Sequence, residues 1–141
     1  MVLSVLLDTN VLLDYLLCRD PYAQDARDIL AACRDGRIKG YMAAHTLPNM
    51  FYILRRTYSI EERRSILLSL CELLDVIDIN REKIIRALQD EGFQDFEDCL
   101  QKECAETIPT DYIVTRNLQD FRSSEIACLD PAAFCAILAS K

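Results

Sequence analysis

The sequence predicts an α/β fold in which helices cover both faces of a central parallel sheet of four to five strands. Short apolar runs without polar alternation, such as residues 3–7 and 112–115, are typical of strands buried on both faces. Segments with the helical spacing of apolar residues separate these runs along the chain. Strands that alternate with helices indicate βαβ units, and therefore a parallel sheet between two helical layers.

The first half of the chain predicts two strands and four helices. In order, these are strand 3–7, helix 11–17, helix 21–33, strand 40–44, helix 46–56 and helix 60–74. Pro21 opens the second helix and Gly36 ends it, because Pro suits a first helical turn and Gly suits the position after the last. Thr46 is the predicted N-cap of the third helix. Glu61 and Glu62 begin the fourth, where negative charge interacts favourably with the helix dipole.

The second half predicts three strands and three helices. In order, these are strand 76–79, helix 80–88, helix 96–106, strand 112–115, strand 126–128 and helix 131–138. Asn80 and Asp95 are the predicted N-caps of the two middle helices, and Gly92 separates them. Asp98 then falls one turn after the cap, on or beside the inward face of its helix.

Length and composition predict a single domain over residues 1–141. The chain is near the common domain size, carries few Gly or Pro residues, and shows neither a linker nor a repeat. A net charge of −7 argues against a protein that coats nucleic acid by bulk electrostatics. The apolar run at residues 2–7 is too short to span a membrane, so we expect a cytoplasmic protein with no membrane partner.

The seven cysteines predict buried free thiols in a reducing compartment. They are an odd number, form no CxxC pair, and are accompanied by a single histidine, His45. A Cys/His zinc site is therefore excluded, and His45 is predicted to be structural or to lie at the rim of a site.

Acidic residues follow the predicted strands and open the helix at residues 96–106. Asp8 comes directly after the first strand, and Asn117 and Asp120 follow the strand at residues 112–115. A third acidic group lies in the segment DFEDCL, which contains Asp95, Glu97 and Asp98. Each group alone is explained by ordinary capping, but ligands of open parallel sheets bind at the carboxyl ends of the strands. Together the groups predict a site for a divalent cation at that edge.

Other enzymes built on similar sheets fit the sequence poorly. A phosphatase of the haloacid dehalogenase type needs a DxD pair after the first strand, where this chain has Asp8-Thr9-Asn10. A phosphoacceptor receiver domain needs paired acids near the start and a late Lys, and neither is evident. With three glycines, the chain has no Gly-rich phosphate-binding turn.

The chain resembles the PIN domain family of metal-dependent nucleases, which includes toxins of the VapC type. The resemblance is carried by four segments in order, LLDTNVLLDYL, DFEDCLQKECA, DYIVTRNLQDF and IACLDPAAF. It implies a PIN-like three-layer α/β/α fold and a pocket that holds Mg²⁺ or Mn²⁺. As substrate it implies single-stranded RNA, and as partners an antitoxin protein and a second copy of the chain.

Carried over by motif, the resemblance assigns roles to individual residues. Asp8 matches the first aspartate of the family, Asp98 matches the acid near the start of the late helix, and Asp120 or Asn117 matches the group after the last main strand. Asp8, Asp98 and Asp120 are thus the expected catalytic residues, and Asp95 lies close enough to join them as a metal ligand. Residues expected to position these ligands or hold substrate are Thr9, Asn10, Asn49, Thr115, Arg116 and Asn117.

Asn49 departs from the family pattern. It lies where the family has a glutamate, and it offers a carbonyl oxygen to a cation but no charge. The resemblance predicts a metal-dependent endoribonuclease, the toxin of a toxin–antitoxin pair. The alternative is a catalytically silent PIN-like domain that acts as a binding or regulatory module.

Overall fold

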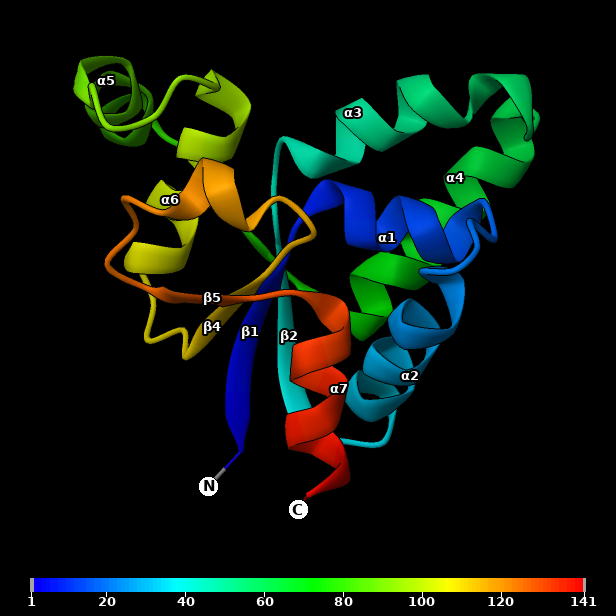
Figure 1. Cartoon of the computed structure of the whole chain (residues 1–141). Coiled ribbons are helices and arrows are strands. Elements are labelled where there is room, and N and C mark those ends of the chain that lie inside the picture. Colours follow the sequence, from blue (N-terminus) through cyan, green and yellow to red (C-terminus); the bar gives the residue numbers. More distant parts are fainter. Residues whose placement is uncertain (1, 141) are drawn as a thin grey trace.

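The computed structural model describes residues 2–140 and contains a five-stranded parallel sheet with seven α-helices in that range (Figure 1). The strands are β1 (Leu3–Leu7), β2 (Ile38–Ala43), β3 (Asp75–Ile77), β4 (Tyr112–Val114) and β5 (Ala127–Leu129). The α-helices are α1 (Thr9–Leu16), α2 (Ala23–Arg34), α3 (Thr46–Ile53), α4 (Ile60–Leu73), α5 (Arg81–Gln89), α6 (Phe96–Glu106) and α7 (Pro131–Ala139). Two 3₁₀ turns, η1 (Leu54–Arg56) and η2 (Leu118–Phe121), complete the order.

The sheet has the strand order β3-β2-β1-β4-β5, and all its pairs are parallel. The chain builds outward from β1 to β2 and β3, then returns to the other side of β1 with β4 and β5. The strand order therefore reverses at β1 and β4, and such a switch point is where open α/β sheets place their ligand sites.

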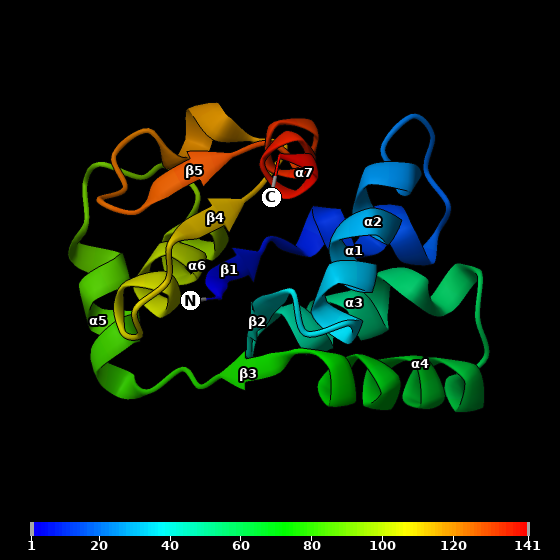
Figure 2. The same cartoon turned by 90° about the horizontal axis from the view of Figure 1, so that it is seen from below.

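Helices cover both faces of the sheet, as predicted (Figures 1 and 2). One face packs against α1, α2, α4 and α7, with side chains such as Val5 and Phe134 in a common core. The other face packs against α6 and η2, where Leu6 meets Cys104 and Phe121. Successive residues at the end of β1 thus enter opposite cores, which explains why Val5, Leu6 and Leu7 are all apolar.

Most predicted helix ends are confirmed. Gly36 follows α2 with a positive φ of 75°, a conformation that glycine adopts without strain. Asp95 caps α6 by accepting from the Asp98 amide. The helix predicted at residues 46–56 divides into α3 and η1, and α3 begins at Thr46 itself. The Thr46 hydroxyl forms no cap and is instead buried in the polar contacts described below.

The thiols and the molecular surface differ in part from expectation. All seven cysteines are free, but Cys18 and Cys71 are exposed, so the prediction of general burial is wrong for these two.

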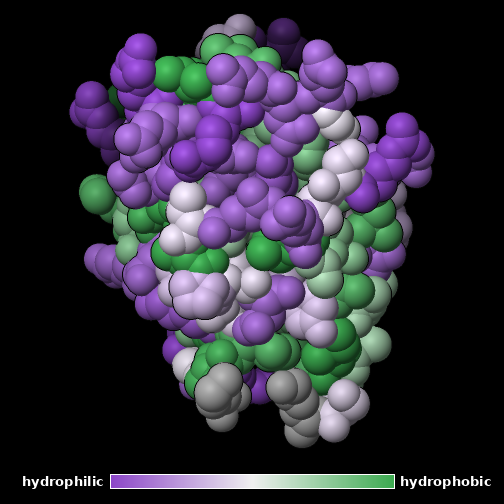
Figure 3. Space-filling view, turned by 90° about the vertical axis from the view of Figure 1, so that its left-hand side faces the viewer, coloured by the Kyte–Doolittle hydropathy of each residue, from purple (hydrophilic) through white to green (hydrophobic). Residues whose placement is uncertain are grey.

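Seen from the α5 and α6 side, hydrophilic residues gather over the end toward which the strands run (Figure 3). Within residues 2–140, no helix has the length and apolar character needed to cross a membrane.

Candidate metal centre

Asp8 lies at the switch point of the sheet, held by the end of β4 and by the first residue of α1. Its backbone amide donates to Val114 O at 3.0 Å, which extends the pairing of β1 with β4 by one residue. Its carboxylate is 2% exposed and accepts from the Thr115 hydroxyl at 2.8 Å and from the Thr9 amide at 2.8 Å. The carboxylate is therefore fixed before any ligand arrives.

Two further carboxylates from the first turn of α6 lie beside Asp8. Asp98 is 6% exposed and Glu97 is half-buried. One oxygen from each of Asp8, Glu97 and Asp98 lies within 4.8 Å of the other two. Among the described residues, this is the cluster of carboxylates at the carboxyl edge of the sheet.

A buried polar layer holds Glu97 in this position. Its Oε1 accepts from the Thr9 hydroxyl at 3.2 Å and from Gln101 Nε2 at 3.0 Å, and lies 2.9 Å from His45 Nε2. Gln101 Nε2 also donates to the Thr46 hydroxyl at 3.0 Å. The first turns of α1, α3 and α6 are thereby joined beneath one carboxylate.

The carboxylates of the cluster carry like charges that repel one another. Burial, together with the charge of Glu97, raises the pKa of Asp8 to about 6. Burial, together with the charge of Asp8, raises the pKa of Asp98 to about 8. Burial also disfavours the ionised form of Glu97, but hydrogen bonds from His45 and Gln101 outweigh it and lower the pKa of Glu97. Glu97 is therefore ionised and acts as an acceptor, so His45 Nε2 is the donor in their contact.

The donor set fits a divalent cation. Buried carboxylates that face one another repel, and a cation among them removes that repulsion. All the donors are oxygens, which Mg²⁺ and Mn²⁺ prefer over the nitrogen and sulfur ligands of zinc sites. The raised pKa values of Asp8 and Asp98 are the electrostatic cost that such an ion offsets.

A pocket of about 310 Å³ opens beside the cluster. The predicted residues Thr9, Asn10 and Asn49 line it together with Asp8 and Glu97. Asn49 lies on α3, one turn after Thr46, and is exposed to the pocket. The structure thus brings five of the sequence-predicted residues to one place, namely Asp8, Thr9, Asn10, Asn49 and Asp98, with Thr115 hydrogen-bonded behind them.

Asp95 and Asp120 lie together in a different hollow. Both are exposed, and they line a smaller space of about 120 Å³ with Arg122. The Asp95 carboxylate is engaged as the N-cap of α6. The structure therefore does not bring these two acids into the cluster of Asp8, Glu97 and Asp98.

Arg116 and Asn117 are held by neighbours within the chain. The Arg116 guanidinium binds the buried Asp14 carboxylate at 2.7 and 3.1 Å and stacks on the Tyr22 ring at 4.0 Å. The backbone amide of Asn117 donates to the Thr115 hydroxyl at 3.0 Å, and the Thr115 hydroxyl in turn donates to the Asp8 carboxylate. Arg116 thus has a structural partner, and Asn117 supports Asp8 through one intermediate residue.

From the sequence, Glu97 was placed in an acidic group but was not named as a ligand, and the roles of Gln101 and Thr46 were missed. Glu97 lies four residues before Gln101 on one helix face. Thr46 was assigned to capping. The spacing of Glu97 and Gln101 was a usable signal, whereas the meeting of α1, α3 and α6 required the tertiary structure.

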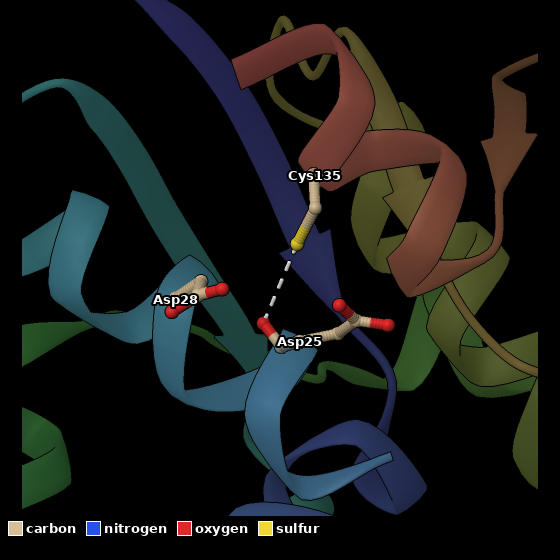
Figure 4. A group of neighbouring side chains, drawn as sticks. All are labelled: Asp25, Asp28 and Cys135. Carbon is tan, nitrogen blue, oxygen red and sulfur yellow. Dashed lines mark hydrogen bonds between the residues drawn. The ribbon is translucent and has the colours of Figure 1, made fainter. Parts of the chain in front are cut away.

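A second acidic group lies on the opposite side of the sheet. Asp25 and Asp28 come from successive turns of α2, and Cys135 comes from α7 (Figure 4). The Cys135 thiol donates to the backbone carbonyl of Asp25 at 3.6 Å. Burial, together with the charges of Asp25 and Asp28, raises the pKa of Cys135 to about 12.

The fold and the pocket together define a three-layer α/β/α protein with an acidic site at the switch point of its sheet. A family model described as PIN domain matches residues 4–119. The chain belongs to the PIN domain family. No curated relative matches its sequence.

Solved structures with the same fold include a toxin–antitoxin complex and two DNA-bound VapBC complexes. VapBC2 from Rickettsia felis, bound to a promoter DNA fragment, is 16% identical, with a TM-score of 0.65 over 91% of this chain and 98% of that one. A toxin–antitoxin complex from Klebsiella pneumoniae is 23% identical, with a TM-score of 0.66 over 90% and 97%. DNA-bound VapBC from Salmonella typhimurium is 17% identical, with a TM-score of 0.68 over 92% and 98%. At these identities the likeness concerns the fold.

Proposed function

We propose that this chain is a metal-dependent endoribonuclease of the PIN domain type that hydrolyses phosphodiester bonds in single-stranded RNA. The observation that carries the proposal is the cluster of Asp8, Glu97 and Asp98 at the switch point of the sheet. Glu97 supplies a third carboxylate, so the cluster does not depend on an acidic residue at position 49. This favours the enzyme over the alternative of a catalytically silent binding module.

The proposed chemistry divides between the carboxylates and the residues around them. Asp8, Glu97 and Asp98 would hold Mg²⁺ or Mn²⁺ by oxygen. The bound cation supplies activation of a water and stabilisation of charge on the scissile phosphate. Thr115 and Thr9 orient Asp8, and the Thr9–Thr46–Gln101 layer orients Glu97. Asn10 and Asn49 offer amide groups to substrate at the pocket wall.

The proposed partner is an antitoxin, which would make the chain the toxin of a cytoplasmic pair. Structural neighbours are VapBC complexes, two of them bound to DNA, and this supports an antitoxin partner. The homodimer stays a prediction, as does the single domain over residues 1–141. Copurification of a small protein expressed from the neighbouring gene tests the antitoxin directly.

The decisive test is cleavage of a mixed single-stranded RNA pool with and without Mn²⁺. We expect wild-type protein to cut the pool, chelator to stop cutting, and Asp8→Asn to reduce the rate by at least about 100-fold, since the charge-stabilising site is lost. Circular dichroism should show that Asp8→Asn keeps its fold. Equal cutting by Asp8→Asn would remove Asp8 from the site, and absence of both cutting and cation binding in wild-type protein would favour the silent module.

A matched set of acids tests the composition of the site. Glu97→Gln is expected to weaken Mn²⁺ binding by about 10-fold or more, because it removes one charge from the cluster. Asp95→Asn and Asp120→Asn are expected to weaken it by less than about threefold, since both acids lie outside the cluster. Asparagine also caps a helix as well as aspartate does, so Asp95→Asn keeps α6 intact. Calorimetric titration with Mn²⁺ measures all three, and a reversed order of effects would contradict this assignment.

A further inference from the structure

The end of α3 carries two exposed apolar side chains at the mouth of the acidic pocket. Tyr52 and Ile53 line the same space of about 310 Å³ as Asp8 and Asn49. Tyr52 is 63% exposed and Ile53 is 40% exposed, which is high for side chains of their size. The helix that presents them begins at Thr46 in the buried polar layer, about 9 Å away at 1.5 Å rise per residue. Tyr52 is thus fixed relative to the carboxylates by one short helix.

The ring of Tyr52 is stacked with an arginine. The Arg55 guanidinium lies 3.7 Å from the ring centroid, and its Nη1 donates to the Tyr52 carbonyl at 2.8 Å. A second pair repeats the arrangement, with the Arg63 guanidinium 4.3 Å from the Phe51 ring and its Nη1 donating to the Phe51 carbonyl at 2.8 Å. These backbone contacts hold the two guanidinium groups against the aromatic rings.

This segment carries more positive than negative charge. Arg55, Arg56, Arg63 and Arg64 lie within ten residues that also contain Glu61 and Glu62, and none of the four arginines forms an ion pair within residues 2–140. In a chain of net charge −7, this local excess of cations favours an anionic partner.

We propose that Tyr52 and Arg55 form a stacking ledge for one base of a single-stranded nucleic acid whose adjoining phosphate enters the acidic pocket. Aromatic rings and guanidinium planes both stack on unpaired bases, and arginine also binds phosphate oxygens. A duplex keeps its base faces covered, so the ledge selects single strands. The proposal rests on the proposed nuclease function for the phosphate, and its binding step is testable separately.

The test is fluorescence anisotropy of a labelled mixed-sequence RNA in EDTA, where binding is measured without cleavage. Tyr52→Ala is expected to weaken binding by about 10-fold, and Tyr52→Phe, which keeps the ring, by less than about twofold. Arg55→Lys keeps the positive charge but loses the planar guanidinium group, so it should also weaken RNA binding, by about fivefold. The same RNA annealed to its complement should bind wild-type protein more weakly than the single strand.

Two exposed residues elsewhere serve as matched controls. Tyr15→Ala removes a 37% exposed tyrosine that lines a separate hollow, and Arg34→Ala removes a surface arginine. Neither should change RNA binding. If Tyr52→Ala binds RNA as tightly as wild-type protein, and thermal melting shows that both proteins are folded, the ledge is overturned. Self-association that Tyr52→Ala abolishes while RNA binding is unchanged would overturn it too and assign this surface to a protein contact.

Failure of the nuclease is distinguishable from failure of the ledge. Should Tyr52→Ala weaken RNA binding while wild-type protein does not cut RNA with Mn²⁺, the ledge stands and the proposed hydrolysis does not. Should Asp8→Asn abolish cutting while Tyr52→Ala binds and cuts as wild-type protein does, the hydrolysis stands and the ledge is excluded.

Discussion

Asp98→Asn is expected to abolish RNA cleavage and, at the same time, to stabilise the metal-free protein at neutral pH. The loss of cleavage follows from removing one of three clustered carboxylates. The gain in stability follows because Asp98 is 6% exposed beside Asp8 and Glu97, so its ionised form is disfavoured in the fold. We expect the free energy of unfolding to rise by about 1–3 kcal/mol, given about 1.4 kcal/mol per unit of pKa shift.

The same carboxylates set how stability depends on pH. The ordinary pKa of aspartate is 3.8, whereas that of Asp8 is about 6 and that of Asp98 about 8 in the fold. Between these values the folded state binds more protons than the unfolded state, so the free energy of unfolding falls as pH rises from about 4 to about 8. Below about pH 4 both states are protonated, and this contribution no longer changes. A bound divalent cation is expected to reduce this loss of stability.

Thermal melting of metal-free protein across this pH range measures the effect. Wild-type protein should lose stability toward pH 8, and Asp98→Asn should show a flatter dependence. Asp95→Asn provides the control, because it changes a neighbouring exposed acid on the same helix turn without removing a cluster member. A wild-type protein whose melting temperature is constant from pH 4 to pH 8 would show that the carboxylates do not repel one another.

The fold was largely predictable because its signals are local. The largely apolar run of β1, the capping residues Asp95 and Asn80, and the glycine after α2 each act within a few residues. The structure confirms the three-layer arrangement and all five strands. The short strands differ from the predicted ranges, since three-residue strands carry little pattern of their own: β3 spans residues 75–77 against a predicted 76–79, and β5 spans 127–129 against 126–128.

The candidate site was predictable only in part because its members come from separate elements. Asp8 and Thr115 follow adjacent strands, so the strand ends alone predict that they meet. The choice between Asp95, Glu97 and Asp98 depends on how α6 is rotated about its axis against α1 and α3. That rotation is fixed by the Thr9–Thr46–Gln101 contacts, which join residues 37 to 92 positions apart in sequence. Among the three acids, Glu97 is the one to which the sequence motifs assigned no role of its own.

Arg116→Ala is expected to destabilise the fold by about 2–4 kcal/mol, because it leaves a buried carboxylate without its main partner. Asp14 is 1% exposed and receives two bonds from Arg116, at 2.7 and 3.1 Å. The other nearby cation, Arg19, lies 3.6 Å from Asp14 Oδ1 and compensates only in part. Chemical denaturation of wild-type, Arg116→Ala and Asp14→Ala proteins measures the loss, and the double variant gives the coupling energy of the pair.

The same series decides between the two roles of Arg116. An arginine that mainly holds substrate phosphate gives a variant of unchanged stability and weaker RNA binding. An arginine that mainly anchors α1 to the end of β4 gives a less stable variant, and Asp14→Ala reproduces its effect although Asp14 is too buried to contact RNA. We expect the second result, with strong coupling in the double variant, since the guanidinium is already bound on one side by Asp14 and stacked on Tyr22. If the effects of the two single variants on stability are additive, Arg116 and Asp14 are not coupled, and Arg116 is instead available to bind substrate.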